Sequence, residues 1–136
     1  MLVEARHGLP IVPLVSAANV PDVQMALPLI DAIPPIGGKI GAPVKKPGQV
    51  SGDKGYDADW LRIGLAARNI TPILAQRGES HPQLVQRGRW IVERTIAWLK
   101  RFRRLAIRYD RDDELHLAFL TLGCILINHN HWVRFC

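Results

Sequence analysis

The stretch that most constrains the fold is residues 49–75, where two short apolar segments flank a predicted helix. Residues 49–56 are typical of a short buried strand that runs into a turn, and Asp57 is placed to cap a helix that continues through Arg68. Residues 70–75 form a second apolar strand. A strand, a helix and a strand in succession predict a parallel crossover connection. We therefore expect an α/β fold.

The residues before this stretch predict a hairpin, a helix and a loop. Residues 2–18 contain two short strands around a Gly-Leu-Pro turn, and joining such a hairpin to parallel strands gives a mixed sheet. Residues 21–33 predict a helix with Asn19 as its N-cap, which Pro28 should kink or shorten. Residues 34–48 are rich in Pro, Gly and Lys and indicate a surface loop.

Residues 86–104 have the periodicity of an amphipathic helix with two unlike faces. The face expected to pack contains Ile91, Thr95, Trp98, Leu99, Phe102 and Leu105. The opposite face contains Arg89, Glu93, Lys100, Arg103 and Arg104. Glu93 is thus a single acid within a row of cations. A solvated face with an ordinary Arg89–Glu93 pair is the alternative interpretation.

The positive charge of the chain is concentrated in one segment. The net charge is +6, and residues 86–111 carry nine bases against two acids, whereas residues 1–85 carry eight bases and seven acids. Basic segments of this density favour a polyanion, because neutralised phosphates dominate such binding. Nucleic acid is therefore the expected partner. An anionic membrane surface is less favoured, since the segment is rich in Arg and the chain has no lipidation signal.

Residues 112–136 predict a helix from Asp113 to Ile127 followed by a solvated tail that contains a His-Asn-His run. The apolar side chains expected to dock this helix on the sheet are Leu115, Ala118, Phe119, Leu122, Ile125 and Leu126. The apolar run is too short to span a bilayer. Cys124 is expected to be a small buried residue, and two unpatterned cysteines fit the reducing cytoplasm.

Two acids stand out as candidate metal ligands. Asp53 follows a predicted parallel strand, at the edge of the sheet where ligand sites form, and its glycine neighbours allow close approach. Stabilisation of the strand-to-helix turn is the competing role for Asp53. If Glu93 faces the same pocket, two carboxylates without His or Cys partners suit Mg²⁺ or Mn²⁺. Such ions support phosphodiester displacement.

The two regions around these acids resemble bacterial insertion-sequence DDE transposases. The second-aspartate region of that family resembles Gly52-Asp53-Lys54-Gly55-Tyr56-Asp57, Leu61-Arg62 and Ile70-Thr71-Pro72-Ile73. The third-acid helix resembles Arg89-Trp90-Ile91-Val92-Glu93-Arg94, Trp98-Leu99-Lys100-Arg101-Phe102-Arg103-Arg104 and Arg108-Tyr109-Asp110. The family signature Tyr-x2-Arg-x3-Glu-x6-Lys is matched by Arg89, Glu93 and Lys100, with Gln86 in place of the Tyr. The resemblance is clearest over residues 49–111.

This resemblance implies a ribonuclease H-like mixed sheet flanked by helices, with DNA transposition as the activity. It makes Asp53 the second and Glu93 the third metal-binding acid, with Mg²⁺ or Mn²⁺ as cofactor. The DNA-binding cations implied for transposon ends and target DNA are Lys54, Arg89, Lys100, Arg101, Arg103 and Arg104. The implied regions are 1–33, 34–48, 49–85, 86–111 and 112–136, all in one partial catalytic domain.

The resemblance also implies that the first strand of the sheet, with the first acid, is missing. The opening hairpin corresponds to the second and third strands of the family fold, and Glu4, Asp22 and Asp31 do not occupy the position of the first acid. The chain then corresponds to a C-terminal part, which pairs with a separately encoded N-terminal half or is a remnant. A homo-oligomer is expected when the enzyme is active. The alternatives are a non-catalytic nucleic-acid-binding module and an inactive remnant.

Overall fold

A computed structural model describes residues 1–37, 40–76 and 83–135 of the 136-residue chain. The chain divides into two compact units. The hairpin unit consists of Met1–Ser16 and Trp90–Cys136, and the crossover unit is Ala17–Arg89. No helix within the described ranges is long and apolar enough to cross a membrane.

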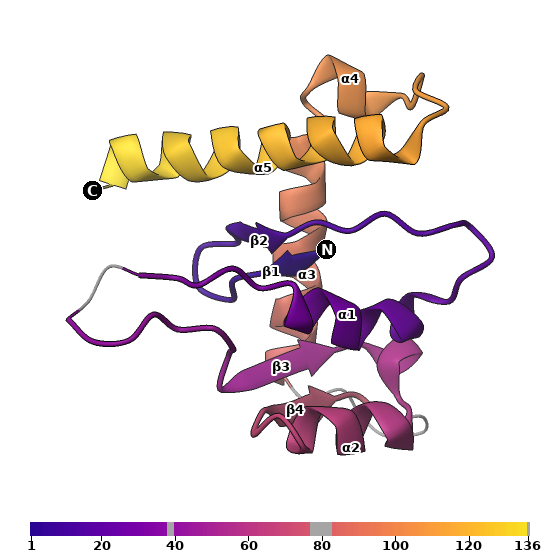
Figure 1. The fold of residues 1–136 in the computed structure, drawn as a ribbon, viewed down its shortest axis with the longest axis vertical. Coiled ribbons are helices and arrows are strands. Elements are labelled where there is room, and N and C mark those ends of the chain that lie inside the picture. Colours follow the sequence, from indigo (N-terminus) through magenta and orange to yellow (C-terminus); the bar gives the residue numbers. More distant parts are fainter. Residues whose placement is uncertain (38–39, 77–82, 136) are drawn as a thin grey trace. The chain divides into compact units, whose positions relative to one another are not determined.

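The crossover unit is built on two parallel strands joined by a helix (Figure 1). Strand β3 (Gln49–Gly52) leads through a 3-10 turn, η2 (Lys54–Tyr56), into helix α2 (Asp59–Ala66) and then strand β4 (Thr71–Leu74). The strands pair in register from Gln49 opposite Thr71 to Gly52 opposite Leu74. This confirms the parallel crossover that the sequence predicts.

Apolar residues of α2, β4 and the turn between them form the core of this unit. Leu61, Leu65, Ile70 and Leu74 are all buried, and Leu65 is fully inaccessible to solvent. The prediction that the first strand is buried was wrong: along β3, exposed residues alternate with half-buried ones. Within the described residues β3 pairs with β4 alone, and Gln49 and Ser51 are exposed.

The predicted helix over residues 21–33 is split into a 3-10 turn, η1 (Asp22–Met25), and helix α1 (Ala26–Asp31). Pro28 explains the split: it falls in the first turn of α1, where its missing N–H costs no helix hydrogen bond. Asn19 does not cap either piece, because Pro21 is at the N-cap of η1 and Met25 at that of α1. The chain then runs irregularly, with one antiparallel bridge between Ile36 and Val44.

The predicted cap of α2 was also wrong. Ala58 is at the N-cap position and contributes no side-chain bond. The carboxylate of Asp57 instead accepts a hydrogen bond from Nη2 of Arg62 at 2.7 Å, so this acid fixes the helix through an ion pair. Most of the polar loop expected before the third-acid helix falls at 77–82, outside the described residues.

The hairpin unit opens with the predicted antiparallel hairpin, strands β1 (Leu2–Val3) and β2 (Pro10–Val12). Strand β2 ends directly before Pro13, whose nitrogen cannot donate to a sheet. The strands of the described residues form two separate two-stranded sheets, one antiparallel and one parallel. The α/β class is therefore confirmed, whereas a single mixed sheet is not what these strands form.

Helix α3 (Gln83–Leu99) begins in the crossover unit and ends in the hairpin unit. It stops short of the predicted end at 104: residues 100–102 form a turn, Phe102 is extended, and a separate short helix, α4 (Arg103–Ala106), follows. The corner packs against Gly123, where an added Cβ would lie 2.9 Å from Cδ1 of Leu105 and 3.1 Å from Cδ2 of Leu99.

Helix α5 (Asp113–Phe135) starts where predicted but continues past Ile127 through the expected tail. Its buried residues are Gly123 and Cys124, and it contacts β2, where Nδ2 of Asn128 donates to the Pro10 carbonyl at 2.9 Å. The predicted docking face was wrong, because Leu115, Leu122, Ile125 and Leu126 are all exposed. The helix is apolar around most of its circumference, so periodicity alone could not select the packed side.

Candidate functional site

Asp53 lies immediately after β3 and shapes the turn that follows it. It occupies the N-cap position of η2, with an extended backbone, and its Oδ1 accepts a hydrogen bond from the Gly55 N–H at 3.0 Å. The turn-stabilising role is therefore confirmed. This bond uses one oxygen of an exposed carboxylate, and it orients the side chain at the carboxyl end of the parallel strand.

The glycines on either side of Asp53 lie close to neighbouring side chains within the turn. A Cβ on Gly52 would lie 3.0 Å from Cδ2 of Leu74 and 3.1 Å from Cβ of Tyr56. A Cβ on Gly55 would lie 3.1 Å from Oδ1 of Asp53. The close approach that the sequence indicates is therefore made by neighbouring side chains of the protein itself.

Tyr56 closes the turn beside Asp53. Burial raises the pKa of the Tyr56 hydroxyl above its ordinary value, and the negative charges of Asp22 and Asp53 raise this pKa further. The influence of both acids shows that η1 brings Asp22 into the electrostatic neighbourhood of this turn, in agreement with the contact between η1 and η2.

Glu93 lies on the exposed side of α3, opposite a buried stripe. The stripe consists of Ile91, Thr95 and Leu99, as the helical periodicity predicts. The two-faced character of the helix is thus confirmed as far as Leu99. Asp53 belongs to the crossover unit and Glu93 to the hairpin unit. Their convergence on one metal ion stays a prediction.

The start of α3 packs closely against β3 inside the crossover unit. Gly88 has so little room that an added Cβ would lie 2.9 Å from Oγ of Ser51. Ser51 precedes Asp53 by two residues, and Gly88 precedes Glu93 by five on a continuous helix. The start of α3, which lies in the crossover unit, is therefore directly beside the strand that leads into Asp53.

Thr95, which was predicted on the packed face, and Arg94 anchor α3 within the hairpin unit through contacts that the sequence did not predict. The buried hydroxyl of Thr95 lies 2.6 Å from the Gly8 carbonyl oxygen and 2.9 Å from that of Ile91. Arg94 donates from Nη2 to the His7 carbonyl at 2.8 Å. Its guanidinium also lies 4.6 Å from the ring centre of Trp90 and 5.0 Å from that of Trp98. The sequence did contain a signal for the ring contacts, because Trp90, Arg94 and Trp98 follow one another at intervals of four and so lie on one side of the helix.

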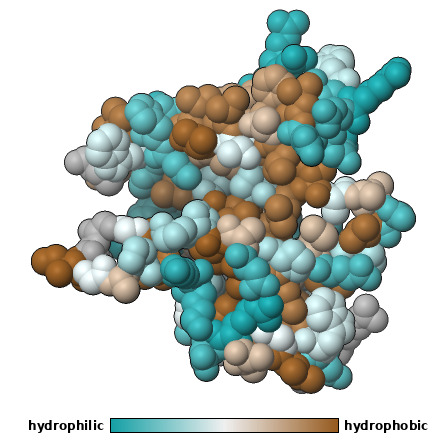
Figure 2. All heavy atoms as spheres, in the orientation of Figure 1, coloured by the Kyte–Doolittle hydropathy of each residue, from teal (hydrophilic) through white to brown (hydrophobic). Residues whose placement is uncertain are grey.

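The predicted DNA-binding cations do not share one helical face. Lys54 lies in η2, Arg89 is exposed on α3, Lys100 and Arg101 are in the turn that ends α3, and Arg103 and Arg104 are on α4. The break after Leu99 therefore corrects the single cationic row that the sequence suggested. Lys100, Arg101, Arg103 and Arg104 are all exposed, and hydrophilic atoms project around α4 in Figure 2.

Arg104 has structural contacts in addition to its predicted role. Its Nη1 lies 3.8 Å from Oδ1 of Asp110, and its guanidinium stacks 4.8 Å from the ring centre of Phe119 on α5. Arg108, which follows α4, pairs with Asp113 at the start of α5. Part of the positive charge of this segment therefore holds α4 and α5 together.

Comparison with known proteins places these features in a family. Residues 1–128 match the transposase DDE domain. The chain is also 47% identical over 129 residues to a protein of Burkholderia cepacia assigned as the transposase for insertion sequence element IS402. The chain belongs to the transposase DDE domain family. The alignment covers 95% of this chain but 61% of that relative, so the chain spans about three-fifths of its length. No solved structure matches the chain.

The acids of this transposase-family chain fit a divalent metal in chemistry but do not complete a site. The carboxylates of Asp53 and Glu93 are hard oxygen donors of the kind that Mg²⁺ and Mn²⁺ prefer. Among residues 1–37, 40–76 and 83–135, no group of three or more His, Cys, Asp or Glu side chains could hold a metal ion. Two carboxylates can contribute only part of such a coordination shell.

Proposed function

We propose that this chain is the C-terminal part of a DDE transposase catalytic domain of the ribonuclease H-like type. In this proposal Asp53 and Glu93 supply the second and third metal-binding acids for DNA cleavage and strand transfer at insertion-sequence ends. The observation that carries it is the packing of α3 against β3 at Gly88 and Ser51. That contact is made by the start of the helix that bears Glu93 and by the strand that leads into Asp53, in a chain of the matching family.

Each residue has a defined task in the proposed reaction. Asp53, oriented by its bond to the Gly55 N–H, and Glu93 would hold the cation between them. When bound, the divalent ion would activate the attacking oxygen and stabilise the leaving oxygen of the phosphodiester. Lys54, Arg89 and Lys100 would neutralise the backbone phosphates and position the strand.

The first acid of the triad is proposed to come from sequence beyond these 136 residues. The IS402 relative is longer than the part that this chain matches, which supports this division. A separately encoded N-terminal half could supply that acid, and the active assembly is proposed to be a homo-oligomer. A truncated remnant would lack the acid altogether.

Metal binding tests the proposed pair of acids directly. Mn²⁺ or Mg²⁺ should raise the melting temperature of the wild-type chain, and Asp53→Ala with Glu93→Ala should abolish that shift. The matched control is Asp59→Ala with Glu114→Ala, which removes two other exposed acids and should leave the response unchanged. An equal metal response in the wild type and in the Asp53/Glu93 variant would end the proposal of a shared site.

A second candidate function, DNA binding without catalysis, is favoured by the exposed cations around α4. Arg104 also contacts Asp110 and Phe119, so the test uses Arg101→Gln with Arg103→Gln. Loss of two phosphate contacts should reduce the slope of log affinity against log salt concentration by about 1.8 for duplex DNA. Lys45→Gln with Lys46→Gln is the charge-matched control. An unchanged slope in the arginine variant would rule out this segment as the phosphate-binding surface.

A further inference from the structure

Helix α5 exposes a continuous stripe of side chains that the proposed catalytic function does not use. Leu115, Leu122, Ile125 and Trp132 are between 45% and 64% exposed. Figure 2 shows hydrophobic atoms gathered in the upper part of the view, where Figure 1 places α5. Single exposed apolar residues are ordinary, but a contiguous apolar surface of this kind is typical of an interaction site.

The spacing of the exposed residues is that of a helix–helix seam. Leu115, Ala118, Leu122, Ile125, His129 and Trp132 follow one another at alternating intervals of three and four, and all six are exposed. This is the heptad pattern of the a and d positions of a coiled coil. The buried residues Gly123 and Cys124, with Asn128 bonded to Pro10, lie off the stripe and face the unit's own core. We name these six residues the α5 stripe.

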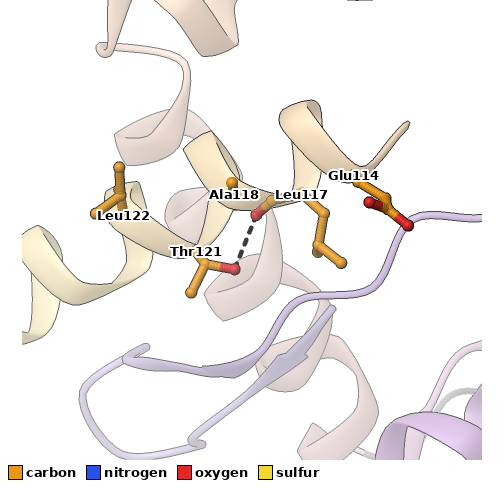
Figure 3. A pocket seen from close by; sticks show the side chains of 5 residues that line it. All are labelled: Glu114, Leu117, Ala118, Thr121 and Leu122. Carbon is orange, nitrogen blue, oxygen red and sulfur yellow. Dashed lines mark hydrogen bonds between the residues drawn. The ribbon is translucent and has the colours of Figure 1, made fainter. Parts of the chain in front are cut away.

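A shallow hollow lies beside the first half of the α5 stripe and shares Ala118 and Leu122 with it. Figure 3 shows the hollow, which is lined by Glu114, Leu117, Ala118, Thr121 and Leu122. The Thr121 hydroxyl is bonded to the Leu117 carbonyl at 2.8 Å, which turns it back onto its own helix. The small Ala118 leaves room for a bulky side chain.

The α5 stripe is complementary to itself when it is reversed. When a second copy of the helix is laid antiparallel to the first, with the midpoint between Gly123 and Cys124 in common, three kinds of pair form. Leu115 lies opposite Trp132, Ala118 opposite His129, and Leu122 opposite Ile125. The smallest residue of the stripe is thus placed against an aromatic ring. A two-fold axis through that point would make every pair occur twice, as an isologous interface requires.

The charges at the two ends of α5 select the antiparallel arrangement. The helix starts at Asp113, with Asp112 and Glu114 on either side of that residue, and has Arg134 in its last turn. Asp113 is paired with Arg108 of the same chain, so the acids at this end that are open to a partner are Asp112 and Glu114. A parallel pair would bring the acidic ends of both copies together. An antiparallel pair places each acidic start beside the basic end of the partner and aligns the two helix dipoles favourably.

From the spacing, the exposure and the charges, we infer that α5 is a homodimerisation helix. Two copies of this chain associate through the α5 stripe in an antiparallel, two-fold symmetric pair. The seam buries Leu122 and Ile125 at its centre, and the ring of Trp132 from each copy lies at the end of the partner stripe, by Leu115. This inference does not depend on metal binding or on catalysis.

Sedimentation of the 136-residue chain at a series of concentrations tests the inference. The wild type should reach a dimer, and Leu122→Glu should raise the dimer dissociation constant at least about tenfold, because it places two like charges near the axis of an apolar seam. Leu122→Ile should leave the constant nearly unchanged. The control is Ile63→Glu on α2, a residue that is 69% exposed outside the α5 stripe. Circular dichroism establishes that each variant keeps its helix content.

Cysteine cross-linking tests the direction of the pair, with Cys136→Ser as the background. A mixture of Leu115→Cys and Trp132→Cys chains should form a mixed disulfide about tenfold faster than either variant alone. Self-cross-linking of Leu115→Cys would indicate a parallel pair and overturn the inference. A monomeric wild type, as expected if additional sequence of longer family members covers the stripe, would overturn it as well. So would equal weakening by Leu122→Glu and Ile63→Glu.

Discussion

The β3–α2–β4 crossover and helix α5 are both rich in apolar residues, but they place them in opposite ways. In the crossover, Leu61, Leu65, Ile70 and Leu74 are all buried within a stretch of about two dozen residues. In α5, by contrast, the buried residues are Gly123 and Cys124, and most of the large side chains are exposed. Hydrophobicity in the first region is used to hold the chain together. In the second it is available to a partner.

The strongest test of this difference is to make the same Leu-to-Ala truncation in both regions. Leu65→Ala should lower the free energy of unfolding by about 2–5 kcal/mol, because it leaves a cavity in a fully buried site. Leu122→Ala removes the same atoms from an exposed site and should change stability by less than about 0.5 kcal/mol in dilute solution. Urea unfolding measures both values. Similar losses would show that α5 is packed internally after all.

A smaller effect separates buried from exposed polar groups. Thr95 and Thr121 both direct a hydroxyl toward the carbonyl four residues earlier, but only the hydroxyl of Thr95 also lies beside the Gly8 carbonyl. Thr95→Val should cost about 1–3 kcal/mol, since it leaves a buried carbonyl without its donor. Thr121→Val should be close to neutral on the exposed surface of α5. Thermal or urea unfolding of the two variants tests the difference.

The smallest expected effect is at the surface of the crossover unit and depends on pH. Hydrogen bonds from Arg68 hold the pKa of Asp31 below its ordinary value of 3.8. A depressed carboxylate pKa stabilises the folded state above pH 3.8 and loses that contribution as the pH falls through the folded value. Arg68→Gln should therefore be slightly less stable than wild type at pH 7. The difference should shrink as the pH falls below 3.8.

The pH effect has a specific readout and control. Chemical unfolding at pH 7 and at pH 3 measures the stability gap between Arg68→Gln and wild type. Asp31 and Arg68 are both substantially exposed, so solvent screening keeps the effect small. Arg87→Gln, which alters an exposed arginine on α3, should show no such pH dependence. A gap that is the same at both pH values would contradict the linkage to Asp31.

The sequence was most informative where local signals agree with one another. The crossover was predictable because turn residues, a helical stretch and two apolar segments all indicate the same connection. The buried stripe of α3 was predictable as far as Leu99 for the same reason. The burial of Cys124 also follows from its apolar surroundings.

The sequence failed where tertiary contacts override local preference. Good helix formers continue past Leu99, yet α3 stops there because Leu99, Phe102 and Leu105 pack around Gly123 of a later helix. Asp57 was a reasonable cap in isolation, but Arg62 takes its carboxylate. The glycine in the middle of an apolar helical run was a readable sign of close packing. Nothing in the local sequence identifies which segment approaches it.

At the candidate site too, features set by local sequence were predictable and features set by tertiary contacts were not. The position of Asp53 at the carboxyl end of a parallel strand was predictable, and so was the exposed position of Glu93 on its helix. The bond from the Gly55 N–H that orients Asp53 was foreseen only as a general property of Asp in turns. The anchoring of α3 through Thr95 and Arg94 was not foreseen, because it depends on carbonyl groups of the distant hairpin.

The burial of Cys124 provides a built-in chemical reporter. Burial raises the pKa of its thiol, and the side chain lies on the side of α5 that is turned away from solvent. Alkylating reagents react with the thiolate form of cysteine. In a Cys136→Ser chain, the rate at which the Cys124 thiol is labelled therefore measures how often α5 separates from the rest of its unit.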